Sequence, residues 1–416
     1  MKHVWILNHY ANHPGGSGGM RHYQLARYLP AHGWQATLIA ASVEHPSGHQ
    51  RLAPRETRRL EHCDEVRFLW LRTPEYRGNG GGRMKNMLHY SLQALRPGRL
   101  RELPAPDLII GSSVHPFAAL AGWWLARRHG VPFVFEVRDL WPQTLIDMGR
   151  LAEGSPTTRA MRVLETFLYR RARRVLTLLP RAVDYVAPQG VPAERVVWLS
   201  NGVDLADYPA PDRPEAPPAE APLTLMYFGS HGDANGLDVL IDAMGRVRDR
   251  LSADEPRVRL RLIGDGALKP ALRRQAEALG LDGRWVSFED PVPRREIPAL
   301  AREADAFVIT VRDLPQLYRF GISMNKLFDY MAAARPVVIA SGAVNDPVAD
   351  AGAGISVPPE DPQALAEGIL AMARLSPEAR ARMGEAGRRH MEETYSYRIL
   401  SGRLADVMDD VVEEAT

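Results

Sequence analysis

The sequence predicts an α/β protein made of two doubly wound, Rossmann-like domains that face a central cleft. Apolar runs of strand length alternate with amphipathic runs of helical length, as in parallel sheets covered by helices. A strand, a glycine-rich loop and a helix open each half of the chain, and a proline-rich stretch separates the halves. At 416 residues the chain is also long for a single core. We expect an N-terminal domain over 1–205, a linker over 206–222, a C-terminal domain over 223–394 and an amphipathic helix over 395–416.

The composition narrows the class of protein. Hydrophobic residues make up 45% of the chain and charged residues 25%, which is typical of a soluble globular protein. The 52 Lys and Arg residues nearly balance the 50 Asp and Glu residues, and a net charge of +2 disfavours a general nucleic-acid binder. Cys63 is the only cysteine, so the chain can form neither an intrachain disulfide nor a Cys-x-x-Cys metal site. These features fit a reducing cytoplasm.

Membrane insertion is not expected. The apolar run near the N-terminus is too short for a signal peptide and is interpreted as a first strand. The longest apolar run, 117–126, is about half of a membrane span and ends in two arginines.

The first domain opens with a strand over 3–8, glycines over 15–19 and a helix that starts at Met20. Gly33 fits a left-handed cap at the end of this helix, and the second strand follows over 36–40. Glycines in such a loop let the backbone approach a bound phosphate or sugar.

Polar residues follow two later strands of the first domain. Ligands in open α/β sheets bind beyond the carboxyl ends of the strands, so these residues are expected to face the cleft. His115 is suited to bonding a ligand hydroxyl or to proton transfer. The charged residues need partners, and a structural ion-pair network remains as open as direct catalysis. The residues are Ser112, Ser113 and His115 after the strand at 107–111, and Glu136, Arg138 and Asp139 at the end of the strand at 132–137.

A basic segment over 83–101 interleaves arginines and Lys85 with apolar residues that include Met84, Met87, Leu88 and Tyr90. Such a segment can rest on an anionic bilayer surface, which would place the protein at the cytoplasmic face of a membrane. The alternative, which we weight more heavily, is an ordinary helix that packs its apolar residues inward and exposes its arginines.

The second domain repeats the opening of the first. A strand over 223–228 leads into a polar, glycine-containing loop over 229–236, and a strand over 258–263 leads into a turn at Gly264. Further strands are expected over 285–288, 305–310 and 354–357. The loop glycines are again suited to a close approach of backbone to ligand.

The stretch 320–342 predicts a nucleotide site. It reads as a loop, a helix from Lys326 to Ala334 and a buried strand over 337–340, and Pro336 stops the helix. The helix N-terminus offers free N–H groups and a positive dipole end to a phosphate or diphosphate. Asp329 can accept from vicinal hydroxyls such as those of a ribose. The alternative is a solvated surface pair of Lys326 and Asp329.

The segment KLFDYMAAARPVV resembles the part of retaining glycosyltransferases of family 4 that carries the second acid of an E-x7-E signature. Asp329 stands at that second acid, whereas Gly321 occupies the place of the first. Residues 18–40 are similar to the glycine-rich opening of the same family. EVRDLWP resembles a bacterial branch that builds O-antigen and related polysaccharides from N-acetylated amino sugars. The resemblance covers nearly the full length and implies the GT-B fold.

The resemblance implies a metal-independent, retaining transfer from a UDP-sugar, with N-acetylhexosamine types preferred, to a polysaccharide, lipid-linked or small-molecule acceptor. It also implies that the C-terminal helix crosses back onto the N-terminal, acceptor-binding domain. The family usually has a diphosphate-binding lysine where Asn235 stands, so another cation is needed, and we favour Lys326 over His231 and Arg319. The nucleotide sugar is a co-substrate, and no cofactor is expected.

These arguments assign roles to named residues. We expect His115, Arg138 and Lys326 to act in catalysis. Arg21, Glu136 and Asp139 are expected on the acceptor side. The donor is expected to contact Gly18, Gly19, Gly229, Ser230, His231, Gly264, Gly321, Ile322, Met324, Asn325, Lys326 and Asp329.

The sequence lacks the motifs that bind NAD or a metal ion. No register of the loop glycines completes a G-x-G-x-x-G fingerprint, which disfavours NAD. There is no D-x-D triplet to hold a metal-bridged diphosphate, and His9 and His13 flank a strand end and a proline, which disfavours a zinc site. Two alternatives of other kinds stay open: a nucleotide-sugar-binding partner without transfer activity, and a UDP-sugar 2-epimerase of the same fold.

Overall fold

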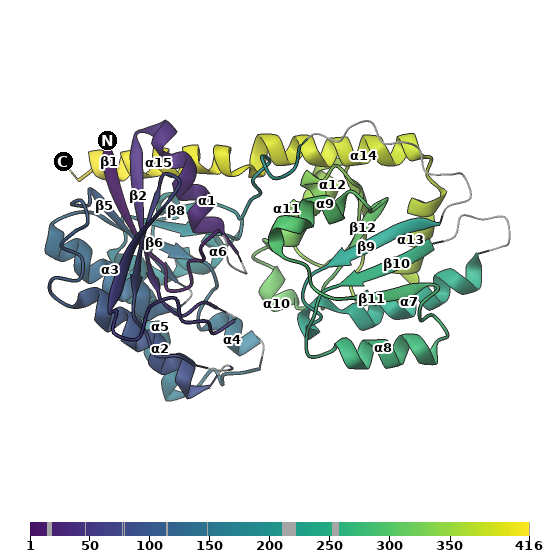
Figure 1. The fold of residues 1–416 in the computed structure, drawn as a ribbon, viewed down its shortest axis with the longest axis horizontal. Coiled ribbons are helices and arrows are strands. Elements are labelled where there is room, and N and C mark those ends of the chain that lie inside the picture. The colour runs from purple at the N-terminus through teal and green to yellow at the C-terminus, as the bar shows by residue number, and fades with distance from the viewer. Residues whose placement is uncertain are drawn as a thin grey trace. The chain divides into compact units, whose positions relative to one another are not determined.

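A computed structural model describes the chain except for residues 15–18, 46, 77, 79, 114, 148, 210–221, 252–257 and 416. The chain forms two compact units (Figure 1). Unit 1 comprises Met1–Asn201, Phe320–Ser323 and Tyr397–Thr416, and unit 2 comprises Gly202–Arg319 and Met324–Ser396. Most of the expected linker lies outside the described residues.

Unit 1 is built on an eight-stranded sheet with the order β3-β4-β2-β1-β5-β6-β7-β8. All neighbouring strands are parallel except β3, which pairs antiparallel with β4 at one edge. The strands are β1 (Lys2–Leu7), β2 (Trp34–Ala41), β3 (Arg58–Cys63), β4 (Val66–Leu71), β5 (Leu108–Ser113), β6 (Phe133–Val137), β7 (Arg174–Thr177) and β8 (Val196–Trp198).

Helices cover both faces of this sheet, and the strands alternate their side chains between two cores. On β1, Trp5 and Leu7 join the core that contains residues of α2, α3 and α5, while Val4 and Ile6 join the core that contains residues of α1 and α15. The α-helices of unit 1 are α1 (Arg21–Tyr28), α2 (Gly81–Leu95), α3 (Pro116–His129), α4 (Gln143–Asp147), α5 (Pro156–Arg171), α6 (Val183–Val186) and α15 (Tyr397–Glu413).

The terminal helix α15 is part of unit 1, although its sequence follows that of unit 2. Leu400, Leu404 and Met408 are buried in the same core as the apolar face of α1. The Ser401 hydroxyl donates to the carbonyl oxygen of Leu25 at 2.9 Å. Packing and hydrogen bonding therefore make α15 part of the helix layer that covers one face of the sheet of unit 1.

Unit 2 has a six-stranded, all-parallel sheet with the order β11-β10-β9-β12-β13-β14. The strands are β9 (Leu223–Phe228), β10 (Val258–Ile263), β11 (Val286–Glu289), β12 (Ala306–Thr310), β13 (Val337–Ala340) and β14 (Gly354–Val357). The α-helices are α7 (Leu237–Arg250), α8 (Lys269–Ala278), α9 (Ile297–Ala301), α10 (Pro315–Tyr318), α11 (Asn325–Ala332), α12 (Pro347–Ala351), α13 (Pro362–Arg374) and α14 (Pro377–His390).

Each sheet has one point where the strand order reverses. In unit 1 the chain winds outward in opposite directions from β1 and β5, and in unit 2 from β9 and β12. Ligands of doubly wound sheets bind beyond the carboxyl ends of the strands at this point. The two switch points therefore locate one candidate site in each unit. No helix in the described part of the chain is long and apolar enough to cross a membrane.

Candidate functional site

Lys326 is the central cation at the switch point of unit 2. It lies in the first turn of α11, and its Nζ atom donates to the Tyr227 hydroxyl at 2.8 Å and to the Oδ1 atom of Asn235 at 2.5 Å. The ammonium also lies 4.5 Å from the centre of the Tyr227 ring, within cation–π range. Tyr227 belongs to β9 and Asn235 to the loop after it, so strand, loop and helix meet at this amine.

Burial lowers the pKa of Lys326 from 10.5 to about 7. Among the described residues no carboxylate forms an ion pair with Lys326, so nothing offsets the lost hydration of its charge. The Asn235 side chain is held in turn, because its Nδ2 atom donates to the carbonyl oxygen of Ser230 at 2.9 Å. The asparagine that replaces the expected loop lysine thus orients the lysine of α11.

Two glycine loops pack tightly beside Lys326. Gly229 and Gly264 end β9 and β10 with φ angles of 153° and 143°, a region that favours glycine. A Cβ atom on Gly264 would lie 1.9 Å from the carbonyl oxygen of Gly229, and one on Gly266 would lie 2.5 Å from the carbonyl carbon of His231. The glycines are therefore required by backbone contact between the loops, whatever ligand they hold.

His231 is fully buried between these loops, and neither ring nitrogen has a hydrogen-bond partner. Burial, and secondarily the charge of Lys269, lowers the pKa of His231 to about 4. Its ring is therefore uncharged at neutral pH and supplies no charge to a diphosphate. The Lys269 ammonium donates hydrogen bonds to the carbonyl oxygens of Gly264 and Glu289, both at 2.8 Å, so its role is structural. Arg319 is exposed. These positions favour Lys326 among the expected cations.

Asp329 is buried on α11 with 4% of its surface exposed. Its Oδ1 atom accepts from the Tyr208 hydroxyl at 2.9 Å and lies 3.6 Å from the guanidinium of Arg294. Burial raises the pKa of Asp329, and Arg294 and Tyr208 oppose that rise. The alternative of a solvated surface pair with Lys326 is therefore wrong. A ribose contact by Asp329 would have to coexist with these two internal partners.

The loop before α11 is divided between the units. Gly321 and Ile322 belong to unit 1, whereas Met324 and Asn325 belong to unit 2. Gly321 has a φ of 104°, a conformation that an acidic side chain would adopt only with strain. The backbone N–H of Asn201 donates to the Ser323 hydroxyl at 3.1 Å, which fixes the segment in unit 1.

His115 lies at the switch point of unit 1 and is 1% exposed. Its Nδ1 atom accepts from the backbone N–H of Ala118 at 3.3 Å and caps α3. An accepting Nδ1 places the proton on Nε2, and this buried Nε2 has no partner. Burial, and then the charge of Arg83, lowers the pKa of His115 to about 3. The ring is thus a neutral donor with one unused N–H group.

His9, at the end of β1, packs its ring against that of His115 with centroids 4.8 Å apart. Its Nε2 atom pairs with the Oδ1 atom of Asn86 at 2.5 Å, and its buried Nδ1 atom has no partner. Sequence reasoning weighed His9 only as a metal ligand and missed this pairing. The position of Asn8 and His9 directly after the first strand was the available signal.

Glu136 lies in a buried ion network. Its Oε1 atom is 3.0 Å from Nε of Arg21, and its Oε2 atom is 2.5 Å from Nε2 of His22. Arg21 also donates to the carbonyl oxygens of Leu199 and Ser200. Burial alone would raise the pKa of Glu136, but His22 and Arg21 hold it well below its usual value. Both Arg21 and Glu136 are 2% exposed, which favours the structural network over direct acceptor contact.

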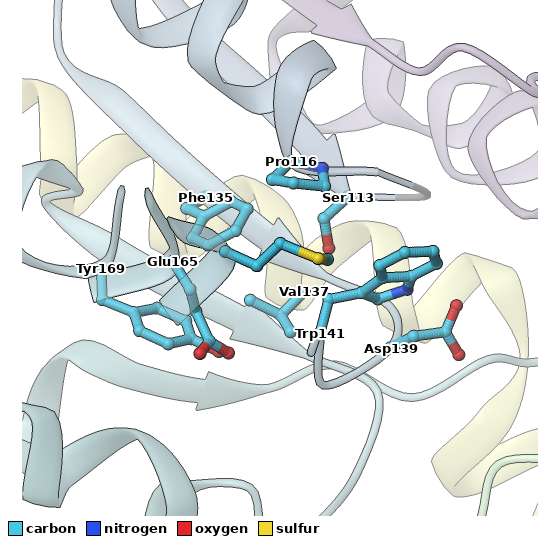
Figure 2. A pocket seen from close by; sticks show the side chains of 9 residues that line it. Ser113, Pro116, Phe135, Val137, Asp139, Trp141, Glu165 and Tyr169 are labelled. Carbon is cyan, nitrogen blue, oxygen red and sulfur yellow. The ribbon is translucent and has the colours of Figure 1, made fainter. Parts of the chain in front are cut away.

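A small cavity of about 10 Å³ lies beside the ends of β5 and β6 (Figure 2). Figure 2 shows Trp141 and Asp139 at one end and Glu165 with Tyr169 at the other. Glu165 accepts from the hydroxyls of Tyr169 and Tyr185 at 3.0 and 3.1 Å, and burial raises its pKa to about 7. Sequence reasoning gave no signal for Glu165, because it lies in the middle of α5.

The remaining expected site residues make few side-chain contacts or are exposed. The backbone N–H of Arg138 donates to the Ser113 hydroxyl at 3.4 Å, and its Nε atom is buried without a partner. Asp139 and Ser230 are exposed, and the carbonyl of Gly19 accepts from Asn12 at 3.3 Å. Gly18 lies outside the described residues. Across the described ranges, no three His, Cys, Asp or Glu side chains are grouped as metal ligands.

The sequence matches two protein families in tandem. Residues 18–202 match the family described as glycosyl transferase 4-like domain, and residues 222–374 match glycosyl transferases group 1. The chain is a two-domain glycosyltransferase. These matches confirm the family that the sequence motifs indicated, and His115 lies in the first matched range and Lys326 in the second.

Curated relatives of this glycosyltransferase come from bacteria. WbjE of Pseudomonas aeruginosa, assigned as a glycosyltransferase, is 27% identical over 323 residues, which cover 74% of this chain and 76% of WbjE. WcaI of Escherichia coli, assigned to colanic acid biosynthesis, is 23% identical over 365 residues, which cover 83% of this chain and 86% of WcaI.

Solved structures confirm the GT-B fold. Sucrose-phosphate synthase of Thermosynechococcus elongatus superposes with a TM-score of 0.72 at 16% identity and full coverage of both chains. HepE of Anabaena, solved in complex with UDP and glucose, has a TM-score of 0.65 at 15% identity, with 99% of this chain and 100% of HepE covered. At these identities the likeness concerns the fold of the glycosyltransferase.

Proposed function

We propose that this glycosyltransferase moves a sugar of the N-acetylhexosamine type from a UDP-sugar to a polysaccharide, lipid-linked or small-molecule acceptor, with retention of anomeric configuration and without a metal. HepE, which shares the fold, was solved with UDP and glucose and supports the choice of UDP. The motif EVRDLWP supports the amino-sugar preference, and the name of WcaI supports a polysaccharide product.

The placement of Lys326 carries the proposal. A buried ammonium at the first turn of α11, held by Tyr227 and Asn235, lies beside the loop after β9 at the switch point of unit 2. Charge grows on the diphosphate as the glycosidic bond breaks, and a preorganised cation stabilises that charge. Binding of the anion would raise the pKa of Lys326 from about 7, so the donor itself would bring the amine into its charged form.

In unit 1, the free Nε2–H group of His115 is suited to donate to a sugar hydroxyl. The same tautomer makes His115 unsuited to accept a proton at Nε2. In a retaining transfer the leaving phosphate oxygen can take the acceptor proton on the same face, so no protein base is required. Arg138 remains a candidate for catalysis and Asp139 for the acceptor side. Arg21 and Glu136 form a buried ion pair that supports the end of β6.

A thermal-shift panel of UDP-, GDP-, ADP- and dTDP-sugars tests the donor. A ligand present at 100 times its dissociation constant adds roughly 2.7 kcal/mol to the free energy of unfolding, which gives a clear shift in Tm. We expect the largest shift with UDP-N-acetylhexosamines. A shift with GDP- or ADP-sugars and none with UDP-sugars would refute the proposed donor.

Product analysis separates transfer from the two other activities that the sequence left open. Product formed only in the presence of an acceptor supports transfer. Product formed without any acceptor would instead indicate epimerisation. Slow donor hydrolysis by the pure protein argues against a non-catalytic binder.

A further inference from the structure

Helix α2 of unit 1 exposes apolar residues and buries polar ones. Met84, Leu88 and Leu92 recur every four residues and are 47%, 42% and 63% exposed, so they form one stripe on the outer face of the helix. Asn86 and Gln93 are buried on its inner face, together with Ser91. The expectation of a helix that turns its apolar residues inward holds for Met87 and Tyr90 but is wrong for this stripe.

Positive charge borders the stripe. Lys85, in α2, and Arg96, directly after α2, are exposed. A groove of about 200 Å³ follows the end of α2 and is lined by Arg96, Arg101 and Arg128 beside apolar residues such as Leu100. In the described part of the chain, none of these three arginines forms an ion pair with a carboxylate. Basic and apolar groups therefore lie together at the C-terminal end of α2.

The neighbouring helix α3 extends the patch with an aromatic residue. Trp124 is 39% exposed, and the Arg128 guanidinium lies 5.4 Å from its ring centre. Tryptophan and arginine side chains of this kind favour the boundary between headgroups and acyl chains.

We propose that this surface, defined by Met84, Leu88, Leu92, Arg96, Arg101 and Arg128, docks on a bilayer that contains anionic phospholipids. The stripe enters the boundary of the acyl chains, and the arginines meet the headgroup phosphates. Charge complementarity selects this partner. A second copy of the same surface would bring the arginines against like charges, which disfavours a self-complementary dimer. The inference concerns where the enzyme works and is independent of the sugar that it transfers.

Co-sedimentation of the full chain with vesicles tests the proposal. We expect binding to vesicles of phosphatidylglycerol and phosphatidylcholine, weak binding to phosphatidylcholine alone, and a loss of affinity as salt is raised. Leu88→Gln with Leu92→Gln should weaken binding at least 10-fold. Arg96→Gln with Arg101→Gln and Arg128→Gln should weaken it about 100-fold, because each arginine near the surface contributes.

Matched controls are available on helix α5 of the same unit and directly after it. Val163 is 72% exposed, and Val163→Gln removes an equally apolar surface side chain outside the patch. Arg159→Gln with Arg171→Gln and Arg173→Gln removes the same net charge from exposed positions. Both controls should keep wild-type binding, and all variants should keep the wild-type melting temperature because only exposed residues change.

Three results would overturn the proposal. The first is equal binding to vesicles with and without phosphatidylglycerol. The second is an equal loss of binding in the patch and α5 variants. The third is a dimer, seen by analytical ultracentrifugation, that Leu88→Gln with Leu92→Gln converts to a monomer, because the stripe would then be an interface between copies of the chain.

Discussion

The Nζ atom of Lys326 lies 2.5 Å from the Oδ1 atom of Asn235. Asn235 occupies the loop position where related glycosyltransferases were expected to carry the diphosphate-binding cation. In this chain Lys326 supplies the positive charge from α11, and Asn235 binds it. This pairing holds the amine in place before a donor arrives and makes Lys326 the most informative residue to change.

Lys326→Ala should lower kcat on the order of 10²-fold with a smaller change in the donor KM, since the charge that it stabilises grows in the transition state. Steady-state kinetics with the preferred UDP-sugar measure both constants. Arg319→Ala and His231→Ala serve as controls. If either abolishes transfer while Lys326→Ala leaves kcat intact, the cation is misassigned. Activity that EDTA abolishes and Mg²⁺ restores would contradict the metal-free mechanism.

Donor affinity should depend on pH through Lys326. Because burial lowers the pKa of Lys326 to about 7, the amine is charged below this pH and increasingly neutral above it. The dissociation constant of a UDP-sugar should therefore rise above pH 7 and level off at the small factor that the lost charge costs in donor binding. Calorimetric titrations between pH 6 and 9 measure it. Lys326→Met should give a flat profile, and a profile unchanged by this substitution would assign the titration to another group.

Asp329→Ala should weaken both UDP and the UDP-sugar if the carboxylate holds the ribose, because a charged hydrogen bond contributes about 1.5 to 3 kcal/mol. The same change leaves Tyr208 and Arg294 without their partner, so Tm should fall as well. Tyr208→Phe separates the two effects, since it removes only the internal hydrogen bond. Unchanged nucleotide affinity in Asp329→Ala would make the residue purely structural.

Glu136→Gln should destabilise the native state by about 3 to 5 kcal/mol at pH 7, because it breaks a buried ion network and leaves Arg21 uncompensated. The folded-state pKa of Glu136 lies well below 4.5, so this stabilisation is present above pH 4.5 and is lost as the pH falls through the folded pKa. Chemical unfolding at several pH values measures the difference. Glu65→Gln, at an exposed position of the same unit, should unfold like the wild type.

His115→Ala should lower kcat/KM for the donor or the acceptor, because it removes a preorganised hydrogen-bond donor. Its pKa of about 3 places its ionisation outside the working range, so His115 should contribute no step to a pH–rate profile between pH 5 and 9. A step in that range that vanishes in His115→Ala would show that the ring titrates and acts as an acid or base.

Four strands of unit 2 could be predicted to the residue. The runs 223–228, 258–263, 337–340 and 354–357 are the observed strands β9, β10, β13 and β14. Apolar residues recur in each of these runs, which local sequence displays directly. By contrast β3, with the sequence RRLEHC, is a half-buried edge strand without an apolar run, so no strand was expected there.

The candidate site could be predicted only in part, because its contacts join residues that are far apart in the sequence. The helix of Lys326 and Asp329 is a local pattern, but their partners Tyr227 and Tyr208 lie 99 and 121 residues away. Which distant hydroxyl meets a buried charge depends on how the sheet folds. The contact between His9 and His115 is likewise set by the pairing of β1 with β5.

The packing of α15 in unit 1 has a consequence for synthesis on the ribosome. Ser401 lies 376 residues after Leu25, and both residues must have left the exit tunnel before they can form their hydrogen bond. Until then the part of α1 that α15 covers is exposed to solvent, and we expect a chaperone to bind the nascent first unit. Chains that terminate early, anywhere before Leu400, would lack this cover, even if both matched family domains had been completed.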